Sequence, residues 1–202
     1  AGLVLALLDL DDYAAALGEA RTLDAADKTG TLGLPVLLAV DRWATEKRRA
    51  DDARGLEQEI LGRSLEPSTR AYVLLLAGEV ERDAGQMSEA RGRFELVLAR
   101  PGAPAIGWYA GLCLAQMDLE SREIAQARAR VDALLNEPLT AEFRGAALAV
   151  GGEAAYAGRI WDEAAARYSR FLVEFPTSPQ TPSVMLALGW AEFRRGRFEA
   201  AR

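Results

Sequence analysis

Apolar side chains recur along the chain at steps of three and four residues, which is the spacing of one face of an α-helix. The clearest example lies within residues 87–98, where the apolar positions are Met87, Ala90, Phe94, Val97 and Leu98. A second helical stretch comes directly before it, over residues 71–85, and ends at Gly85. The pattern therefore predicts a helix, a short turn and a second helix, followed by a connector that contains Pro101.

This pair of helices repeats with a period of about 37 residues. One column of the repeat is always alanine: Ala16, Ala53, Ala90, Ala127, Ala164 and Ala201. Three residues earlier, each unit has an apolar or aromatic residue: Tyr13, Ala50, Met87, Ile124, Trp161 and Phe198. Because one short pair of helices cannot bury its apolar face alone, neighbouring pairs are expected to stack around a continuous core. The predicted fold is an all-α solenoid.

We expect one array over residues 1–202, with units at about 1–31, 32–67, 68–102, 103–139, 140–177 and 178–202. The last unit is cut within its second helix, and the chain begins with Ala1, so we expect a fragment of a longer protein. The apolar start of the chain lacks the basic leader and the cleavage site of a signal peptide. The stretch 27–35 is the expected flexible connector, and Pro35 suits the first turn of the helix that follows.

The units resemble tetratricopeptide repeats (TPR). In that family the first helix contains Leu-Gly, the turn reads Gly-x-aromatic-x-x-Ala, and an aromatic residue and a proline follow. The third unit matches with Leu74, Gly78, Gly85, Met87, Ala90, Phe94 and Pro101. The fifth unit matches with Leu148, Gly152, Trp161, Ala164, Tyr168 and Pro176, and the last with Leu188, Gly189, Gly196, Phe198 and Ala201. The resemblance implies a right-handed α-solenoid whose first helices line a concave groove.

Glycines in these units are predicted to serve two purposes. Gly78 and Gly152 are expected where the first helix crosses the second, opposite the conserved-register alanines at 90 and 164, because only small residues let two helices approach closely. Gly85 and Gly196 are expected where the first helix stops, because a left-handed backbone there suits glycine, and the turn glycine of unit five, Gly158, lies one residue further from Trp161 than the motif has it. The predicted turns lie near residues 9–11, 85–86, 158–160 and 196–197.

Units two and four depart from the motif. Unit two has Asp41 at the crossing position and no turn glycine, so either its turn is looser or its two helices run together. Unit four also lacks a turn glycine, and its first helix could be registered on Gly111 or shifted by several residues.

Composition argues against catalysis and against several classes of ligand. The chain has no histidine and one cysteine, which removes the usual general base, the Cys-His nucleophile pair and any ordinary zinc site. We therefore expect a protein that is not an enzyme and has no cofactor or metal. Cys113 is expected to be a buried structural thiol. The acid pairs at residues 11–12 and 51–52 are expected to favour the amino ends of second helices. A net charge of −6 argues against nucleic-acid binding and against electrostatic binding to a membrane surface. No window approaches the roughly 20 apolar residues of a membrane span, so no direct membrane insertion is expected.

The predicted function is a non-catalytic scaffold that binds a protein or peptide partner in the concave groove implied by the resemblance. The predicted groove residues are Tyr72, Leu75, Glu79, Arg82, Glu153, Tyr156, Leu186, Trp190, Phe193 and Arg194. Trp190 and Phe193 could instead pack against a neighbouring unit. The alternative function is a sensory or regulatory TPR module of a larger transcription regulator or signalling protein.

A narrower resemblance concerns the segment that joins units five and six. Phe175, Pro176, Ser178 and Pro179 follow a pattern that is similar to the units of bacterial cell-envelope TPR proteins, those of outer-membrane assembly and of the Tol-Pal system. This resemblance favours the periplasm or cell envelope over the cytoplasm.

Overall fold

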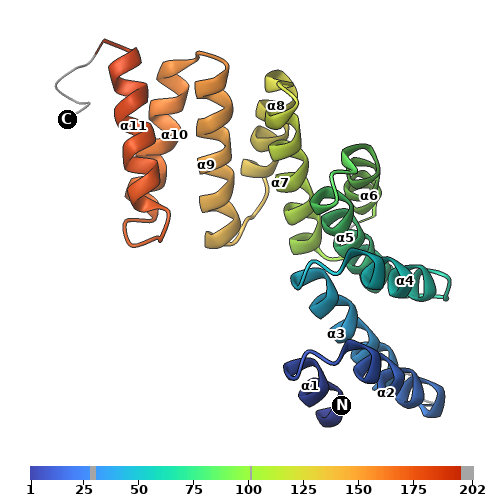
Figure 1. Cartoon of the computed structure of the whole chain (residues 1–202). Coiled ribbons are helices and arrows are strands. Elements are labelled where there is room, and N and C mark those ends of the chain that lie inside the picture. The colour runs from blue at the N-terminus through green and yellow to red at the C-terminus, as the bar shows by residue number, and fades with distance from the viewer. Residues whose placement is uncertain (28–30, 101, 197–202) are drawn as a thin grey trace. The chain divides into compact units, whose positions relative to one another are not determined.

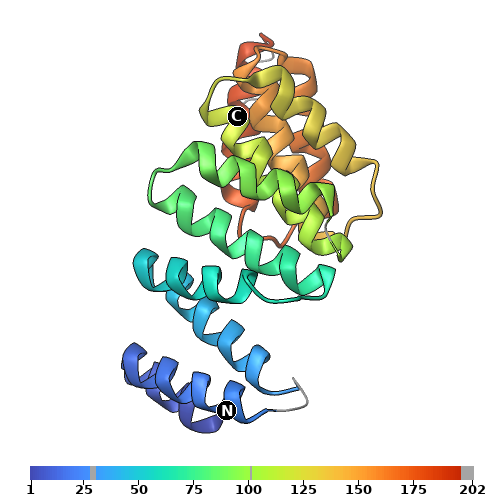
Figure 2. The same cartoon turned by 90° about the vertical axis from the view of Figure 1, so that its right-hand side faces the viewer.

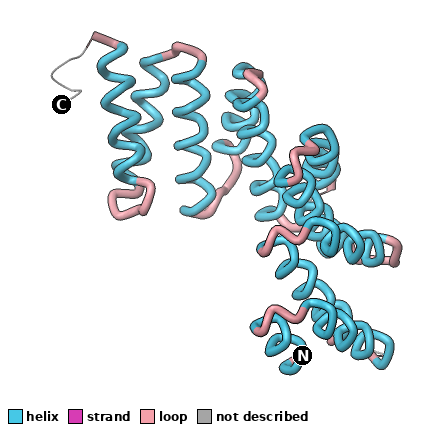
Figure 3. The backbone as a smooth tube through the Cα atoms, viewed as in Figure 1, coloured by secondary structure: helices cyan, strands magenta, loops and turns pink. Residues whose placement is uncertain are grey.

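The structure is a computed structural model that describes residues 1–27, 31–100 and 102–196. Within these residues it contains α-helices and turns but no strand, as predicted (Figures 1 and 3). In chain order the helices are α1 (Gly2–Asp9), α2 (Tyr13–Ala26), α3 (Gly33–Glu46), α4 (Ala50–Leu61), α5 (Pro67–Asp83), α6 (Met87–Ala99), α7 (Pro104–Glu120), α8 (Ile124–Leu135), α9 (Ala141–Ala157), α10 (Trp161–Glu174) and α11 (Thr181–Arg194).

The chain divides into two compact units, residues 1–102 and 103–202, which are described separately. In the first unit each helix packs against the next one along the chain, from α1 to α6, and α3 also packs against α5. In the second unit α7, α8, α9, α10 and α11 pack in the same sequential way, and α7 also packs against α9. The two helices of a pair lie side by side and antiparallel, as α5 and α6 show in Figure 2 and α9 and α10 show in Figure 1. Each unit is therefore a stack of helical hairpins, the architecture of an α-solenoid.

The predicted period is visible in the helix boundaries. Every second helix of a pair begins at the apolar column identified in the sequence: Tyr13, Ala50, Met87, Ile124 and Trp161. The alanine column is buried, with Ala90 and Ala164 both fully inaccessible to solvent as expected. Phe198 and Ala201, which continue these columns in the last unit, lie outside the described residues, as do Pro101 and residue 197 of the last predicted turn.

All the turns within the pairs share one backbone geometry. A residue with positive φ occurs at the same register position in each pair: Asp11, Arg48, Gly85, Arg122, Arg159 and Gly196. In five of them the next backbone N–H donates to the carbonyl five residues earlier, as from Arg49 to Ala44 and from Gln86 to Glu81. This is the Schellman arrangement that closes a helix.

This shared geometry corrects the expectation for the turn of unit two and shows that the turn forms without a glycine. Units two and four have the same tight turn as the others, so α3 and α4 are neither loosely connected nor continuous. In unit five the left-handed residue is Arg159 (φ 60°), whereas Gly158 ends α9 with a negative φ of −77°. The Schellman hydrogen bonds hold an arginine in a conformation that glycine adopts more readily.

The atoms nearest to the crossing glycines belong to aromatic rings of the second helices. A Cβ added at Gly78 would lie 2.7 Å from Cε1 of Phe94, and one at Gly152 would lie 2.6 Å from Cδ1 of Tyr168 and closer still to its Cε1. The expected partners, Ala90 and Ala164, are four residues earlier on the same second helices. In unit four the crossing position holds Ala115, so α7 is shifted from a register on Gly111.

Other local expectations hold. Asp12 caps α2 by accepting a hydrogen bond from the backbone N–H of Ala15 at 3.1 Å, and Asp51 and Asp52 lie in the first turn of α4. Pro35 lies in the first turn of α3, and Cys113 is buried on α7. None of the described helices is both long and apolar enough to cross a membrane.

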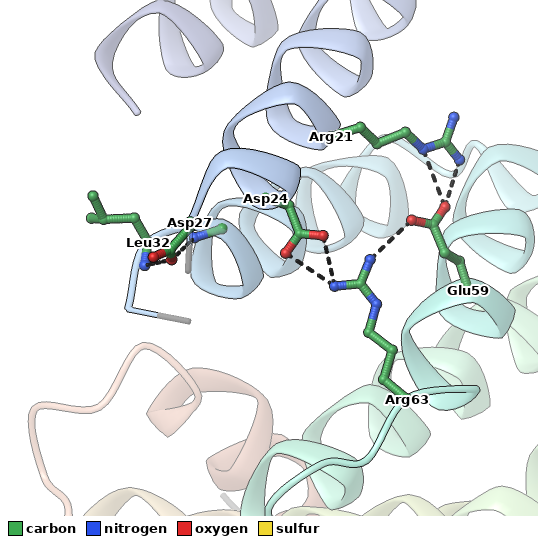
Figure 4. Close-up of polar contacts among 7 residues, drawn as sticks. Arg21, Asp24, Asp27, Leu32, Glu59 and Arg63 are labelled. Carbon is green, nitrogen blue, oxygen red and sulfur yellow. Dashed lines mark hydrogen bonds and ion pairs between the residues drawn. The ribbon is translucent and has the colours of Figure 1, made fainter. Parts of the chain in front are cut away.

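Ion pairs join second helices across the surface of the first unit. Arg63, two residues after the end of α4, contacts Asp24 on α2 at 2.9 Å and also reaches Glu59, which in turn pairs with Arg21 (Figure 4). Asp27 accepts hydrogen bonds from the backbone N–H groups of Leu32 and Gly33, where α3 begins (Figure 4). Because these charges remain in contact with solvent at the surface, each pair adds little to stability, on the order of 0–1 kcal/mol.

Candidate functional site

A hollow on the described surface lies in the second unit, between the first helices α9 and α11. Both helices pack against α10, and the ring of Tyr168 on α10 forms the floor between them. A cavity of about 390 Å³ is lined by Tyr156, Tyr168, Ala187, Trp190 and Arg194. A second hollow of about 200 Å³ shares Tyr168 and Ala187 with it and extends toward Glu153. We call this combined surface the α9–α11 groove.

Small side chains open the groove. The second hollow is lined by Ala146 and Ala149 on α9 and by Ser183 and Ala187 on α11. Ala146 and Ser183 occupy the same position of the 37-residue repeat, in the fifth and sixth repeats. In the third and fourth repeats this position is occupied by Tyr72 and Tyr109. The short side chains at this register position in α9 and α11 line the smaller hollow.

The larger cavity has an aromatic wall. The ring of Tyr156 meets Trp161 edge to face, with their centroids 5.0 Å apart, and Trp190 meets Phe193 in the same way at 6.1 Å. The Arg194 guanidinium lies 5.9 Å from the centroid of Trp161, within the range of a cation–π contact. Aromatic rings and arginine give large contact areas with few rotatable bonds, which suits the centre of a binding surface.

The two ends of the groove carry opposite charges. Arg194 lies in the larger cavity, and the neighbouring Arg195 holds the ion pairs with Asp162 and Glu192, both at 2.7 Å. Glu153 lies in the smaller hollow, where desolvation by its surroundings raises the pKa of its carboxyl above the usual value. Burial also raises the pKa of the Tyr168 hydroxyl, with the Glu153 charge as a further cause. Neither Arg194 nor Glu153 has an ion-pair partner within the described residues.

Four of the ten predicted groove residues meet in this surface: Glu153, Tyr156, Trp190 and Arg194. Leu186 and Phe193 are 66% and 48% exposed on α11 but line neither hollow. The other four lie on α5 in the first unit. There Leu75 is only 8% exposed, whereas Tyr72, Glu79 and Arg82 are half-buried. Tyr72 takes part in a side-chain hydrogen bond with Arg42 of α3.

The sequence did not predict that Tyr168 and the small side chains would line the groove. Tyr168 occupies the motif position of a packing aromatic residue, and it does pack against Gly152, but one side of it also faces the groove. Ala187, Ala146 and Ala149 carry no chemical signal of their own. One repeat position could have indicated the hollow: it holds Tyr72 and Tyr109 in the third and fourth repeats but the smaller Ala146 and Ser183 in the fifth and sixth.

Comparison with known proteins identifies the fold and nothing narrower. No protein-family model and no curated protein matches the chain. Among solved structures, BtubC (BKLC) from P. vanneervenii is similar with a TM-score of 0.79 and 15% sequence identity, over 98% of this chain and 86% of that one. A tetratricopeptide repeat protein from Parabacteroides merdae is similar with a TM-score of 0.69 and 13% identity, over 99% of this chain and 73% of that one. The chain therefore has a TPR-like helical-repeat fold of the α-solenoid class.

Proposed function

We propose that this chain is a non-catalytic scaffold that binds a polypeptide in the α9–α11 groove. TPR-like folds generally serve as protein-interaction scaffolds, because stacked helices offer extended surfaces and no catalytic machinery of their own. The observation that carries the proposal is the cavity of about 390 Å³ between α9 and α11, with its aromatic wall and with Arg194 at its edge. Specific binding pockets commonly begin near that size.

The chemistry of the groove defines the partner segment. The aromatic wall of the larger cavity suits one bulky apolar side chain, aromatic or aliphatic. An acidic group of the partner would lie near Arg194, and a basic group would lie near Glu153. Since desolvation disfavours the ionised form of Glu153, a cation placed there would stabilise that form. The expected segment thus carries a bulky apolar residue between an acidic and a basic one.

A peptide-display experiment tests this function. The full chain would be used to select from a random peptide library, and the affinity of enriched peptides would be measured by fluorescence polarisation. We expect a bulky apolar residue to be enriched, and we expect Tyr156→Ala and Trp190→Ala each to weaken binding about tenfold or more. The matched control is Tyr109→Ala, which removes an exposed aromatic ring on α7 outside the groove. Peptides that bind both groove variants as tightly as the original chain would contradict the proposal.

The surface of α5 is a separate part of the proposal. Tyr72, Glu79 and Arg82 are partly exposed on α5 whereas Leu75 is buried, so a partner that binds this surface of the first unit would contact the three polar residues. Capture of an identified partner by the Arg82→Glu variant, compared with Tyr156→Ala, separates the two surfaces. If both variants retain the partner at the original level, neither first-helix surface is the binding site.

We also propose a cell-envelope location, which rests on the sequence of residues 175–179 alone. In the structure this segment forms the turn before α11, where the Thr181 hydroxyl donates a hydrogen bond to the carbonyl of Phe175. Fractionation of cells that express the full-length protein tests it, and recovery in the cytoplasmic fraction would exclude that location.

A further inference from the structure

One pair of positions lies at the centre of every helical hairpin, where a first helix meets its second helix. In α5–α6 the pair is Gly78 and Phe94, and in α9–α10 it is Gly152 and Tyr168. The same positions hold Ala115 and Val131 in α7–α8, both fully buried. In two of these hairpins a large ring on the second helix is thus matched by a glycine on the first. In the third, an alanine and a valine fill the space between the two helices.

In α3–α4 the same two positions hold carboxylic acids, Asp41 and Glu57. Asp41 is 0% exposed and Glu57 is 4% exposed. Both carboxyl oxygens of Asp41 and Oε1 of Glu57 are buried without a hydrogen-bond partner. An ionised carboxylate only accepts hydrogen bonds, so burying it without donors is costly, whereas the protonated acid carries no charge.

The surrounding charges do not compensate the pair. From α5, Glu81 adds a third acidic group, and from α6 the guanidinium of Arg93 is bound to Glu81 at 3.1 Å. Arg54, on α4 itself, is bound to Gln86 at 2.7 Å and lies near Asp51.

The other neighbouring elements supply no positive charge to the pair. Tyr13 from α2 and Tyr72 from α5 face Asp41 and are uncharged at neutral pH, and α1 carries no titratable side chain except the exposed Asp9. Desolvation therefore dominates. It raises the pKa of Asp41 to about 7 and, with repulsion from Asp41 and Glu81, the pKa of Glu57 to about 8.

We propose that this buried carboxyl pair makes the α3–α4 hairpin a proton-dependent element, stable while the pair holds its protons and loosened as the pH rises from mildly acidic to mildly alkaline values. The direction follows from linkage. The folded chain retains these protons at pH values where the unfolded chain has lost them, so stability falls as pH rises from about 4 through 7 to 8. The hairpins with apolar central pairs have no such dependence from this position.

The proposal can be tested on the full chain by thermal unfolding followed by circular dichroism. Between about pH 5.5 and about pH 8.5, we expect the melting temperature to fall by roughly 5 °C or more. The variant Asp41→Gly with Glu57→Phe installs the central pair of α5–α6 and should remove most of this fall. The variant Asp41→Asn with Glu57→Gln keeps the side-chain shapes without the titration and should also flatten it.

A matched control and a local probe make the test specific. Asp51→Asn with Glu66→Gln removes one exposed aspartate and one exposed glutamate from the same region and should leave the pH dependence as it is. Trp43 on α3 is the one tryptophan of the first unit, so its ¹⁹F resonance in 5-fluorotryptophan-labelled protein reports on this hairpin. It should shift or broaden at the higher pH, while that of Trp108 stays unchanged.

Several results would overturn the proposal. A melting temperature of the unmodified chain that is constant over this pH range would do so, whatever the variants show. So would a pH dependence that survives in the Asn/Gln variant, or one that the exposed-acid control abolishes. A Trp43 resonance that is insensitive to pH would place the titrating groups elsewhere.

Discussion

The hairpins α3–α4 and α9–α10 share the same turn geometry, but the side chains at their centres differ in chemistry. Both close with a positive-φ arginine and a Schellman hydrogen bond, and both bury the alanine of the repeat, Ala53 in one and Ala164 in the other. At the centre, α9–α10 fits a tyrosine ring onto a glycine, whereas α3–α4 holds two carboxylic acids. The comparison teaches that the turn and the alanine column determine the hairpin, and that the central pair can vary within it.

The largest expected effect comes from closing the space beside Tyr168. Gly152→Ala places a methyl group 2.6 Å from Cδ1 of the Tyr168 ring, which is itself buried, so the ring or the helix backbone has to shift. We expect the free energy of unfolding to fall by about 2–4 kcal/mol, which exceeds the gain of about 1 kcal/mol in helix propensity. Chemical denaturation measures the change.

Gly92→Ala is the matched control for that substitution. Gly92 is an exposed glycine within α6, and a Cβ there would meet no atom within 4 Å. Its replacement should leave the free energy of unfolding unchanged or raise it by up to about 1 kcal/mol. If Gly152→Ala behaves like Gly92→Ala, the ring of Tyr168 does not determine the crossing.

The next effect concerns the alanine that both hairpins share. Ala164→Leu adds three carbons at a fully buried position of α10, and we expect the overpacking to lower the free energy of unfolding by about 1–3 kcal/mol. Ala166→Leu adds the same atoms on the exposed side of the same helix and should change it by less than about 0.5 kcal/mol. Equal melting temperatures for the two variants would show that the buried register of α10 is different.

A smaller effect measures the coupling within the central pair. Gly152→Ala combined with Tyr168→Val gives α9–α10 the pair that α7–α8 uses, Ala115 and Val131. Because valine removes the ring that the new methyl group meets, the double variant should be less destabilised than the sum of the single variants, by about 1 kcal/mol or more. A double-mutant cycle from denaturation curves gives this value. Strict additivity would mean that the two positions do not share their space.

The smallest effect lies in the turns. Arg159 holds a left-handed conformation that glycine holds in the equivalent turn at Gly85. Arg159→Gly should therefore raise the free energy of unfolding by about 0.5–1 kcal/mol, and Gly85→Arg should lower it by a similar amount. Differential scanning calorimetry on the two variants would detect both changes. A loss of stability in Arg159→Gly would mean that the arginine side chain contributes more than the strain costs.

Periodicity predicted most of the fold because it reports directly on burial. The apolar column from Tyr13 to Trp161 marks the first residue of each second helix, and the alanine column marks where helices pack. Turn glycines were less informative, since the same Schellman turn forms at Arg48, Arg122 and Arg159. Backbone hydrogen bonds and packing on both sides of such a turn outweigh the preference of a single residue, so the absence of glycine did not predict a looser turn.

The candidate site was predicted only where its residues carry a visible chemical property. Tyr156, Trp190 and Arg194 stood out as aromatic or charged residues on first helices, and the structure brings them to one cavity. Ala187 did not stand out, because the sequence does not distinguish a small residue that packs closely from one that leaves a hollow between two helices. Tyr168 did not stand out, because it occupies the motif position of a packing aromatic residue.

By itself, then, the sequence determined the repeat and the all-α class, because both depend on the spacing of apolar residues along one chain. Only the tertiary structure decided which residues face each other across helices: Gly78 with Phe94, Asp41 with Glu57, and α9 with α11 around Tyr168. These pairings depend on distances between segments 16 or more residues apart, and helical periodicity carries no information about such distances.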